Sequence, residues 1–378
     1  MNKQFKKICI SLVCIIAIAG IGSIRSMKKS DNRNPYLIKT FPAKITEYST
    51  PTVTWGANNM FAINNPYLTI FKIENGKIKQ CDSNLRNPEN ILQFNHKGDY
   101  LVWANKYNGT KITKVNTRTG KIKQKKYPPI PITGTDVPST LNPQNCTWHP
   151  KLNDFVVTKY PTIYYFTLKA APKSQYTNLS FDIFDKKSAK NIPGVGIKTI
   201  KFSSDGKSLA YIGENSNKVV IMDNSFNTIK EFSLKNLQNI LVPIPKKDDF
   251  IIVEYAKNIS TIKQIKIKSN KVKIIAKIKG KINNIDIAPE GNIIAFAVDN
   301  TIQFLNAKSG KKIGQQYALV ADKKDIIQSV KFSKNGKYIS SIGETKIQIW
   351  KNPLNKEASS IRKEDLLKRI QYVLEPKL

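Results

Sequence analysis

Short copies of one pattern of strands and turns recur along most of the chain, and this repetition limits the possible folds more than any other feature. Each copy has an alternating apolar stretch, a polar turn, an apolar run, a second polar turn and a further alternating stretch. The clearest copies are IKFSSDGKSLAYIGENSNKVVIMD (200–223), IDIAPEGNIIAFAVDNTIQFLNAKSGK (285–311) and SVKFSKNGKYISSIGETKIQIWK (329–351). Four further copies lie at 52–77, 92–121, 146–168 and 240–271.

The spacing of the copies is that of propeller blades. The first turns of the seven copies lie at Gly56, Gly98, Asn153, Gly206, Asp248, Gly291 and Gly336. Successive positions are 42, 55, 53, 42, 43 and 45 residues apart, and four of the six distances match the period of about 40 to 45 residues of a four-stranded blade. Each long interval contains an insertion, at 127–145 and at 169–178.

One copy is too small to bury its own apolar residues, such as Val330 and Phe332 in the last copy. Sheets that pack face to face around an axis bury both of their faces. We therefore predict an all-β fold, a seven-bladed β-propeller of four-stranded blades over 51–352. The last copy has three strands, and PYLIKTF (35–41), within a linker at 25–50, is predicted to supply the fourth and close the ring.

The turn and strand sequences KFSSDGKSLAYIG (201–213) and KFSKNGKYISSIGETKIQIWK (331–351) resemble those of the WD-repeat family. The segments TRTGK (117–121) and AKSGK (307–311) look like the outer-strand turn of that family. The resemblance covers most of 51–352 and implies a propeller that binds other proteins or acts as a scaffold. Propellers of exported bacterial proteins are an equally good match.

The first 24 residues are predicted to be a signal peptide or a membrane anchor. Lys3, Lys6 and Lys7 precede an uncharged apolar run from Ile8 to Ile24. The tripeptide at 17–19, Ala-Ile-Ala, suits signal-peptide cleavage, whereas the 17 apolar residues just reach the length of a membrane-spanning helix. Either alternative places the body outside the cytosol, as a periplasmic or secreted protein or one anchored by residues 8–24.

The residues after the last copy, 353–378, are predicted to form an amphipathic helix. Ser360 can cap its start, and an apolar stripe runs from Leu366 to Leu374. We expect the stripe to dock on the outside of the propeller. A helix that binds a partner or a membrane surface is the alternative.

The chain is strongly basic, with a formal net charge of +35. Only six of its 62 basic residues are arginine, and phosphate recognition favours the arginine fork, so solvated lysine faces explain most of this charge. The alternative is binding of a polyanion, nucleic acid or an anionic envelope polymer, by a lysine stripe in the fifth copy. Its residues are Lys263, Lys266, Lys268, Lys271 and Lys273.

Catalytic and metal-binding patterns are absent from the sequence. His96 and His149 are the only histidines, and both are interpreted as solvated residues of first turns. The adjacent Asp248 and Asp249 are likewise interpreted as a solvated turn. Two cysteines outside the signal, Cys81 and Cys146, allow one disulfide or two free thiols. We expect no enzyme activity, no cofactor and no small-molecule substrate, and an active site in the central channel is the weaker alternative.

Basic and aromatic residues around the two insertions form the predicted contact surface, because long loops on a rigid scaffold usually carry recognition. They are Lys125, Lys126, Tyr127, Tyr160, Tyr164, Tyr165 and Tyr176. The sequence thus predicts an exported propeller that binds another protein or scaffolds an assembly.

Overall fold

The computed structural model describes residues 36–43, 51–65, 68–85, 90–105, 109–122, 146–159, 162–170, 182–191, 196–314, 319–320 and 325–355. The predicted export segment, the insertion at 127–145 and the predicted helix beyond Asn355 lie outside these residues. Contacts divide the chain into two compact units, Met1–Leu37 and Ile38–Leu378, and the repeats belong to the second. Among the described residues we find no helix with the length and apolar character needed to cross a membrane.

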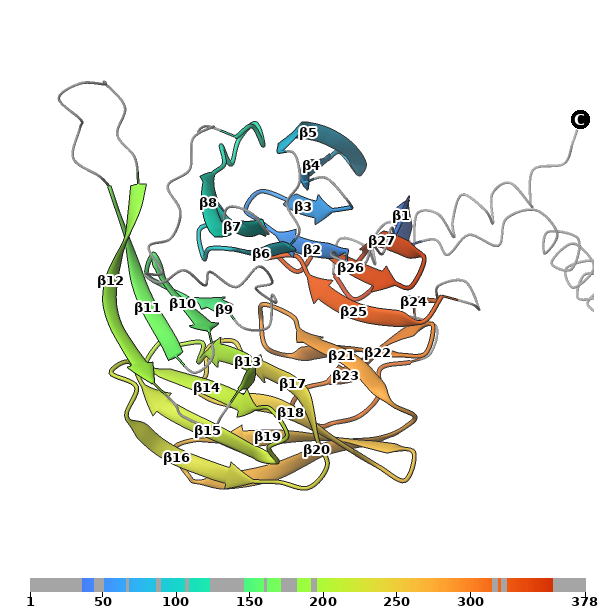
Figure 1. Cartoon of the computed structure of the whole chain (residues 1–378). Coiled ribbons are helices and arrows are strands. Elements are labelled where there is room, and N and C mark those ends of the chain that lie inside the picture. The colour runs from blue at the N-terminus through green and yellow to red at the C-terminus, as the bar shows by residue number, and fades with distance from the viewer. Residues whose placement is uncertain are drawn as a thin grey trace, which may run out of the picture. The chain divides into compact units, whose positions relative to one another are not determined.

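Seven sheets confirm the predicted all-β, seven-bladed propeller (Figure 1). The strands of blades 1 and 2 are β2 (Thr52–Trp55), β3 (Met60–Asn64), β4 (Leu68–Glu74), β5 (Lys77–Leu85), β6 (Asn90–Phe94), β7 (Tyr100–Asn105) and β8 (Gly109–Lys114). Those of blades 3 and 4 are β9 (Cys146–Trp148), β10 (Asp154–Lys159), β11 (Thr162–Ala170), β12 (Asp182–Asn191), β13 (Ile197–Phe202), β14 (Ser208–Gly213), β15 (Lys218–Asp223) and β16 (Thr228–Ser233).

The remaining strands form blades 5 to 7. Blade 5 has β17 (Leu237–Pro243), β18 (Phe250–Ala256), β19 (Ile259–Lys266) and β20 (Lys271–Lys279). Blade 6 has β21 (Ile282–Ile287), β22 (Ile293–Val298), β23 (Thr301–Asn306) and β24 (Leu319–Val320). Blade 7 has β25 (Ile327–Phe332), β26 (Tyr338–Gly343) and β27 (Lys346–Lys351), with β1 (Leu37–Pro42) beside β27.

The ends of the repeat region meet in blade 7. Strand β1 takes the place for which the sequence predicts a ring-closing strand, and the Ala43 amide donates to the Thr345 carbonyl at 2.7 Å. Blade 2 departs from the predicted four strands, because its sheet has three within the described part of the chain. Most blades are therefore four-stranded, and the sheet that closes the ring takes its strands from both ends of the region.

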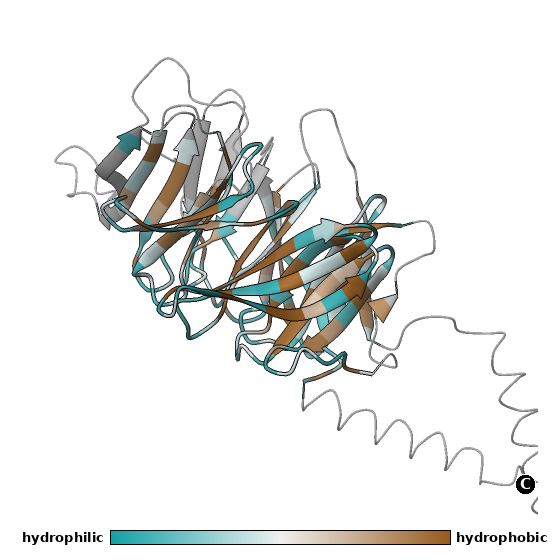
Figure 2. Cartoon of the chain, turned by 90° about the horizontal axis from the view of Figure 1, so that it is seen from below, coloured by the Kyte–Doolittle hydropathy of each residue, from teal (hydrophilic) through white to brown (hydrophobic). Residues whose placement is uncertain are grey.

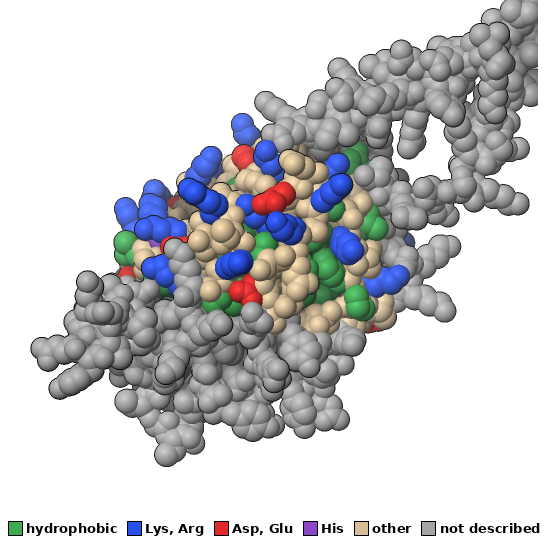
Figure 3. Space-filling view, turned by 90° about the horizontal axis from the view of Figure 1, so that it is seen from above, with side chains coloured by type: hydrophobic (Ala, Val, Ile, Leu, Met, Phe, Trp, Pro, Cys, Tyr) green, Lys and Arg blue, Asp and Glu red, His purple; other side chains and the backbone are tan. Residues whose placement is uncertain are grey.

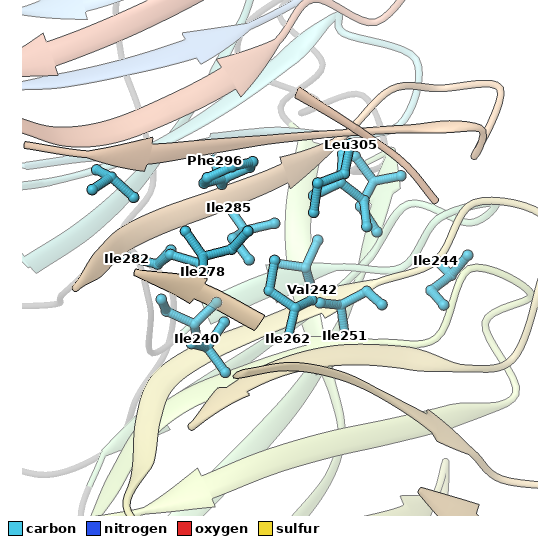
Figure 4. Close-up of a cluster of buried hydrophobic side chains, with 14 residues drawn as sticks. Ile240, Val242, Ile244, Ile251, Ile262, Ile278, Ile282, Ile285, Phe296 and Leu305 are labelled. Atoms are coloured by element: carbon cyan, nitrogen blue, oxygen red, sulfur yellow. The ribbon is translucent and has the colours of Figure 1, made fainter. Parts of the chain in front are cut away.

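The core lies between neighbouring blades. Apolar and polar residues alternate along many strands (Figure 2), so each sheet offers apolar side chains to the blades beside it. The cluster between blades 5 and 6 includes Val242, Ile262, Ile285 and Phe296 (Figure 4). Burying one such side chain contributes roughly 1.5 to 3 kcal/mol, so the blades hold one another in place through their shared faces.

Two tryptophans secure the seventh blade. Trp350, the last tryptophan of the chain, is fully buried, and its Nε1–H donates to Ser341 Oγ at 2.9 Å. Trp55 of blade 1 donates from Nε1 to Ser340 Oγ at 3.0 Å and stacks on Tyr338, with ring centroids 6.2 Å apart. Blade 7 is thus joined to blade 1 by aromatic packing and a buried hydrogen bond.

Candidate binding surfaces

Most of the predicted loop surface lies outside the described residues. These positions are Lys125, Lys126, Tyr127, Tyr160 and Tyr176. Tyr164 is described, and its half-buried ring stacks on Phe166 with a centroid distance of 6.2 Å. Tyr164 is therefore the one residue of the predicted set that the structure places at a partly accessible position within the described chain.

Tyr165 belongs to the core and not to a contact surface. Its side chain is 5% exposed, and its hydroxyl donates to Asp154 Oδ2 at 2.8 Å. The ring packs against Phe202 and Phe226 of blade 4. Burial and the neighbouring carboxylate raise the pKa of the phenol. The structure removes Tyr165 from the predicted surface because strand alternation turns it toward the next blade.

A lysine-rich edge runs along blade 5, and we call residues 257–281 the lysine edge. This stretch has nine lysines and no acidic residue. Strand β20 is the outermost strand of its sheet, with no further strand on its outer side. Lys271, Val272, Lys273 and Ile274 are consecutive exposed residues of β20, with Val272 39% and Ile274 51% exposed. Lysine and arginine side chains also outnumber acidic ones on the side of the molecule in Figure 3.

The structure divides the five predicted lysines of this edge into two groups. Lys263 is half-buried and forms a salt bridge with Glu254 at 2.5 Å, so its charge is already compensated. Lys268 is 88% exposed and lies 3.8 Å from Asp248 Oδ2, a pair that solvent screens strongly. Lys266, Lys271 and Lys273 form no ion pair with a described carboxylate.

The free lysines face each other across two strands. Lys266 is directly opposite Lys271 in the β19–β20 pairing, and Gln264 is opposite Lys273. Like charges directly opposite one another destabilise a sheet. A partner that brings negative charge to this edge would relieve that repulsion.

The first turns of the blades are joined to one another. Gly206 in blade 4 has φ +79°, and a Cβ atom there would lie 2.3 Å from Nε2 of His149 in blade 3. The backbone amides of Lys151 and Leu152 donate to His149 Nδ1 at 3.1 and 3.0 Å, so Nε2 carries the proton and donates to the Gly206 carbonyl at 3.1 Å. His149 is 5% exposed, and the prediction of a solvated side chain is wrong for it.

The inner strands carry one compensated carboxylate near their ends. Asp286 of β21 accepts from the Phe332 amide at 2.7 Å and lies 3.4 Å from Lys331 Nζ, both in blade 7. Lys201 occupies the position in β13 of blade 4 that Asp286 occupies in β21, and it donates to the Cys146 carbonyl at 3.4 Å. Burial lowers the pKa of Lys201 to about 8. Within the described residues, no group of three or more His, Cys, Asp or Glu side chains could hold a metal ion.

The remaining titratable residues have structural roles. Asp249 accepts hydrogen bonds from Gln264 Nε2 at 2.6 Å and from the Ile267 amide at 3.3 Å, so it fixes the end of β19. Cys81 and Cys146 are not joined by a disulfide. Cys146 is buried, and burial raises its pKa to about 12, which keeps it unreactive.

Comparisons with known proteins support the fold. No family model matches the chain, and no curated protein matches its sequence. A solved structure described as "Crystal Structure of Mitotic Checkpoint Complex" matches with a TM-score of 0.60 and 13% identity, over 85% of this chain and 94% of that one. At this identity the likeness supports the fold alone, a seven-bladed propeller.

Proposed function

We propose that this protein is a binding module that docks an acidic protein segment along the lysine edge of blade 5. The observation that carries the proposal is the exposed run Lys271–Ile274 on the outermost strand β20, where lysines alternate with apolar residues. The lysines attract a negatively charged partner, and Val272 and Ile274 offer apolar contact that a purely ionic partner would leave unused. Sheet edges of this kind bind extended peptides by adding a strand.

A protein partner explains these features better than nucleic acid does. The basic residues are almost all lysine, and the planar arginine fork that suits phosphates is rare in the chain. The exposed apolar residues of β20 also interrupt the row of charges. The likeness to a component of a protein complex agrees with a protein partner in general terms. We regard the molecule as a scaffold without catalytic activity of its own.

A peptide-binding measurement tests the proposal. The probes are a short peptide that alternates Glu with Val, a peptide of equal charge that alternates Glu with Ser, and a single-stranded oligonucleotide of equal charge. We expect the Glu-Val peptide to bind most tightly. Reversing Lys271 and Lys273 to Glu should weaken its binding about tenfold or more, because two attractive contacts become repulsive. Reversing Lys77 and Lys79, exposed lysines of the outermost strand β5 of blade 1, is the matched control.

Two outcomes would argue against the proposal. If the oligonucleotide binds best and affinity falls steeply with added salt, the edge is a polyanion site. If neither pair of charge reversals changes peptide binding, the partner uses another surface. The predicted loop is then the next candidate, and a version without residues 127–145 should lose partners in a pull-down from cell-envelope extract.

We also propose that the propeller works outside the cytosol. Lysines 3, 6 and 7 followed by the apolar run 8–24 support this location. Mass spectrometry of the purified protein from cells distinguishes the two forms of export. A mature N-terminus after Ala19 would indicate a cleaved signal, whereas an intact Met1 in a membrane fraction would indicate an anchor. An intact Met1 in the soluble cytosolic fraction would contradict export.

A further inference from the structure

The first turn of blade 1 is one residue shorter than those of the other six blades. In those six, the last paired residue of the inner strand faces the residue seven positions later, as Phe202 faces Leu209. In blade 1, Trp55 faces Phe61, only six positions later. Asn58 and Asn59 close this turn with φ values of 52° and 58°, a left-handed conformation that asparagine tolerates.

The short turn borders a hollow between the first turns of blades 7, 1 and 2. Its volume is about 250 Å³. Most of its lining residues are polar or basic, although apolar atoms make up the greater part of the lining surface. The lining residues are Gly56, Ala57, Asn58, Asn59, His96, Lys97, Ser333, Lys334 and Asn335.

Lys334 brings a positive charge to the hollow without a matching carboxylate. Its Nζ donates to the backbone carbonyls of Asn95 and His96, the latter at 2.8 Å, so it reaches from blade 7 past blade 1 to blade 2. No described carboxylate forms a salt bridge with it. Asp99 acts on it only through longer-range attraction, and Asn95 Nδ2 already donates to Asp99 Oδ1 at 2.8 Å.

The surroundings make this charge costly without an anion. Burial of the ammonium lowers the pKa of Lys334 to about 8, although the residue as a whole is exposed to solvent. Two carbonyl oxygens occupy two of the three ammonium hydrogens, and the third has no partner among the described residues. An ammonium taken from water is stabilised best by an opposite charge.

A second lining cation suits the same kind of ligand. Lys97 is exposed at the rim and has no ion-pair partner in the described chain. Burial and the two nearby lysines lower the pKa of His96, which therefore lines the hollow as a neutral ring. The ring forms a hydrogen bond with the backbone of Leu152, and its buried Nδ1 has no partner among the described residues. The amide of Asn335 donates to Asn59 Oδ1 at 2.5 Å and holds the walls of blades 7 and 1 together.

We propose that this hollow binds a small oxyanion, the phosphate or carboxylate group of a soluble ligand, with Lys334 as the principal donor and Lys97 as the second. The volume admits one such group and a short neighbouring portion of the ligand. Binding leaves the existing contacts of Lys334 in place and uses its remaining hydrogen. The site does not include the lysine edge, so it stands or falls independently of the proposed peptide partner.

Isothermal titration calorimetry of the full chain tests this site. Inorganic phosphate and acetate are titrated separately at neutral pH and low, matched ionic strength. We expect one saturable site in the unmodified protein. Lys334→Met should weaken binding about tenfold or more and Lys97→Gln about threefold, because a charge-assisted hydrogen bond and a rim charge are lost. Lys151→Gln, an exposed lysine of the blade 3 turn, should bind like the unmodified protein.

The two anions distinguish the source of the oxyanion. Tighter binding of phosphate would indicate a phosphorylated ligand, and tighter binding of acetate a carboxylated one. Absence of saturable heat with both anions, or unchanged binding by Lys334→Met, would overturn the proposal. If Lys334→Met fails to fold in a circular dichroism melt, Lys97→Gln decides, and its unchanged affinity would overturn the proposal. Reversal of Lys271 and Lys273 should leave this binding intact.

Discussion

The first turns of blades 4 and 1 occupy equivalent places in the ring but differ in what fills the space beside them. At blade 4 the neutral His149 ring fills the space against Gly206 and satisfies three backbone groups. At blade 1 the turn is one residue shorter, and a basic hollow lies beside it. The two turns differ in length by one residue. The longer one forms a closed contact with His149, and the shorter one borders an open, basic hollow.

The largest effect is expected from closing off the space that His149 occupies. Gly206→Ala should lower the free energy of unfolding by about 2 to 4 kcal/mol, because it adds a clash with the imidazole to the strain of a left-handed residue. Gly76→Ala is the matched control. Gly76 has φ +73° and nothing within 4 Å of an added Cβ, so it carries the strain alone, about 1 kcal/mol. Urea denaturation measures both, and equal losses would show that His149 does not fill the space.

The next effect comes from the histidine itself. His149→Ala should cost about 2 to 3 kcal/mol, because it removes a buried ring and leaves backbone groups unpaired. His149→Asn should cost less, since Asn95, at the equivalent position of blade 2, accepts hydrogen bonds from amides of its own turn, although four and five residues on and not two and three. In a double-mutant cycle with Gly206→Ala, the two losses should sum to more than the loss of the double variant. Strict additivity would contradict direct contact.

A smaller effect is expected from a change in the turn that borders the hollow. Inserting one glycine between Asn58 and Asn59 restores the turn length of the other blades. We expect phosphate affinity to fall about tenfold, because the longer turn occupies the hollow, while the thermal midpoint changes little. A glycine inserted after Asn75, in the outer turn of the same blade, controls for insertion in general. Unchanged affinity in the first variant would mean that turn length does not shape the site.

The smallest effect is a dependence on pH. Acetate keeps its charge above neutral pH, whereas Lys334, with its pKa lowered to about 8, loses its proton as the pH rises. The ammonium is charged below this pKa and neutral above it, so acetate affinity should fall as the pH passes through about 8. Lys97, Asp99 and His96 also face this ammonium. Calorimetry of the unmodified protein and Lys334→Met measures the difference, and identical pH profiles would exclude Lys334 as the titrating group.

The propeller was predictable from the sequence because its turns recur at regular spacing, and the inner-strand residues alternate as buried strands require. The details of those turns were not. The sequence aligns Gly56 with Gly98, but the Gly56 amide donates to Met60 as the Asn95 amide donates to Tyr100, so Gly56 corresponds to Asn95. The sequence WGANNMF already contains the shorter turn of blade 1, but only this pairing shows that the turn lacks one residue.

The burial and the contacts of individual polar residues were even less predictable from the sequence. A turn histidine is usually exposed, and the approach of Gly206 and Phe202 from the next blade buries His149. Lys334 joins segments more than 200 residues apart in the chain, 238 between it and His96, which no local pattern can reveal. In the lysine edge, the sequence shows the run of lysines, but the outermost position of β20 depends on the sheet order and the compensation of Lys263 by Glu254 on the pairing of β18 with β19.

The joint in blade 7 also determines how the ring responds to force. Strand β1 is held beside β27, so the first and last strands of the ring belong to one sheet. A pull on both ends of the chain acts on that sheet before it reaches any other blade. Under tension we therefore expect blade 7 to open first, which would uncover the buried Trp350 while blades 3 to 6 remain paired. This sheet would therefore limit the force that the ring can bear between its two ends.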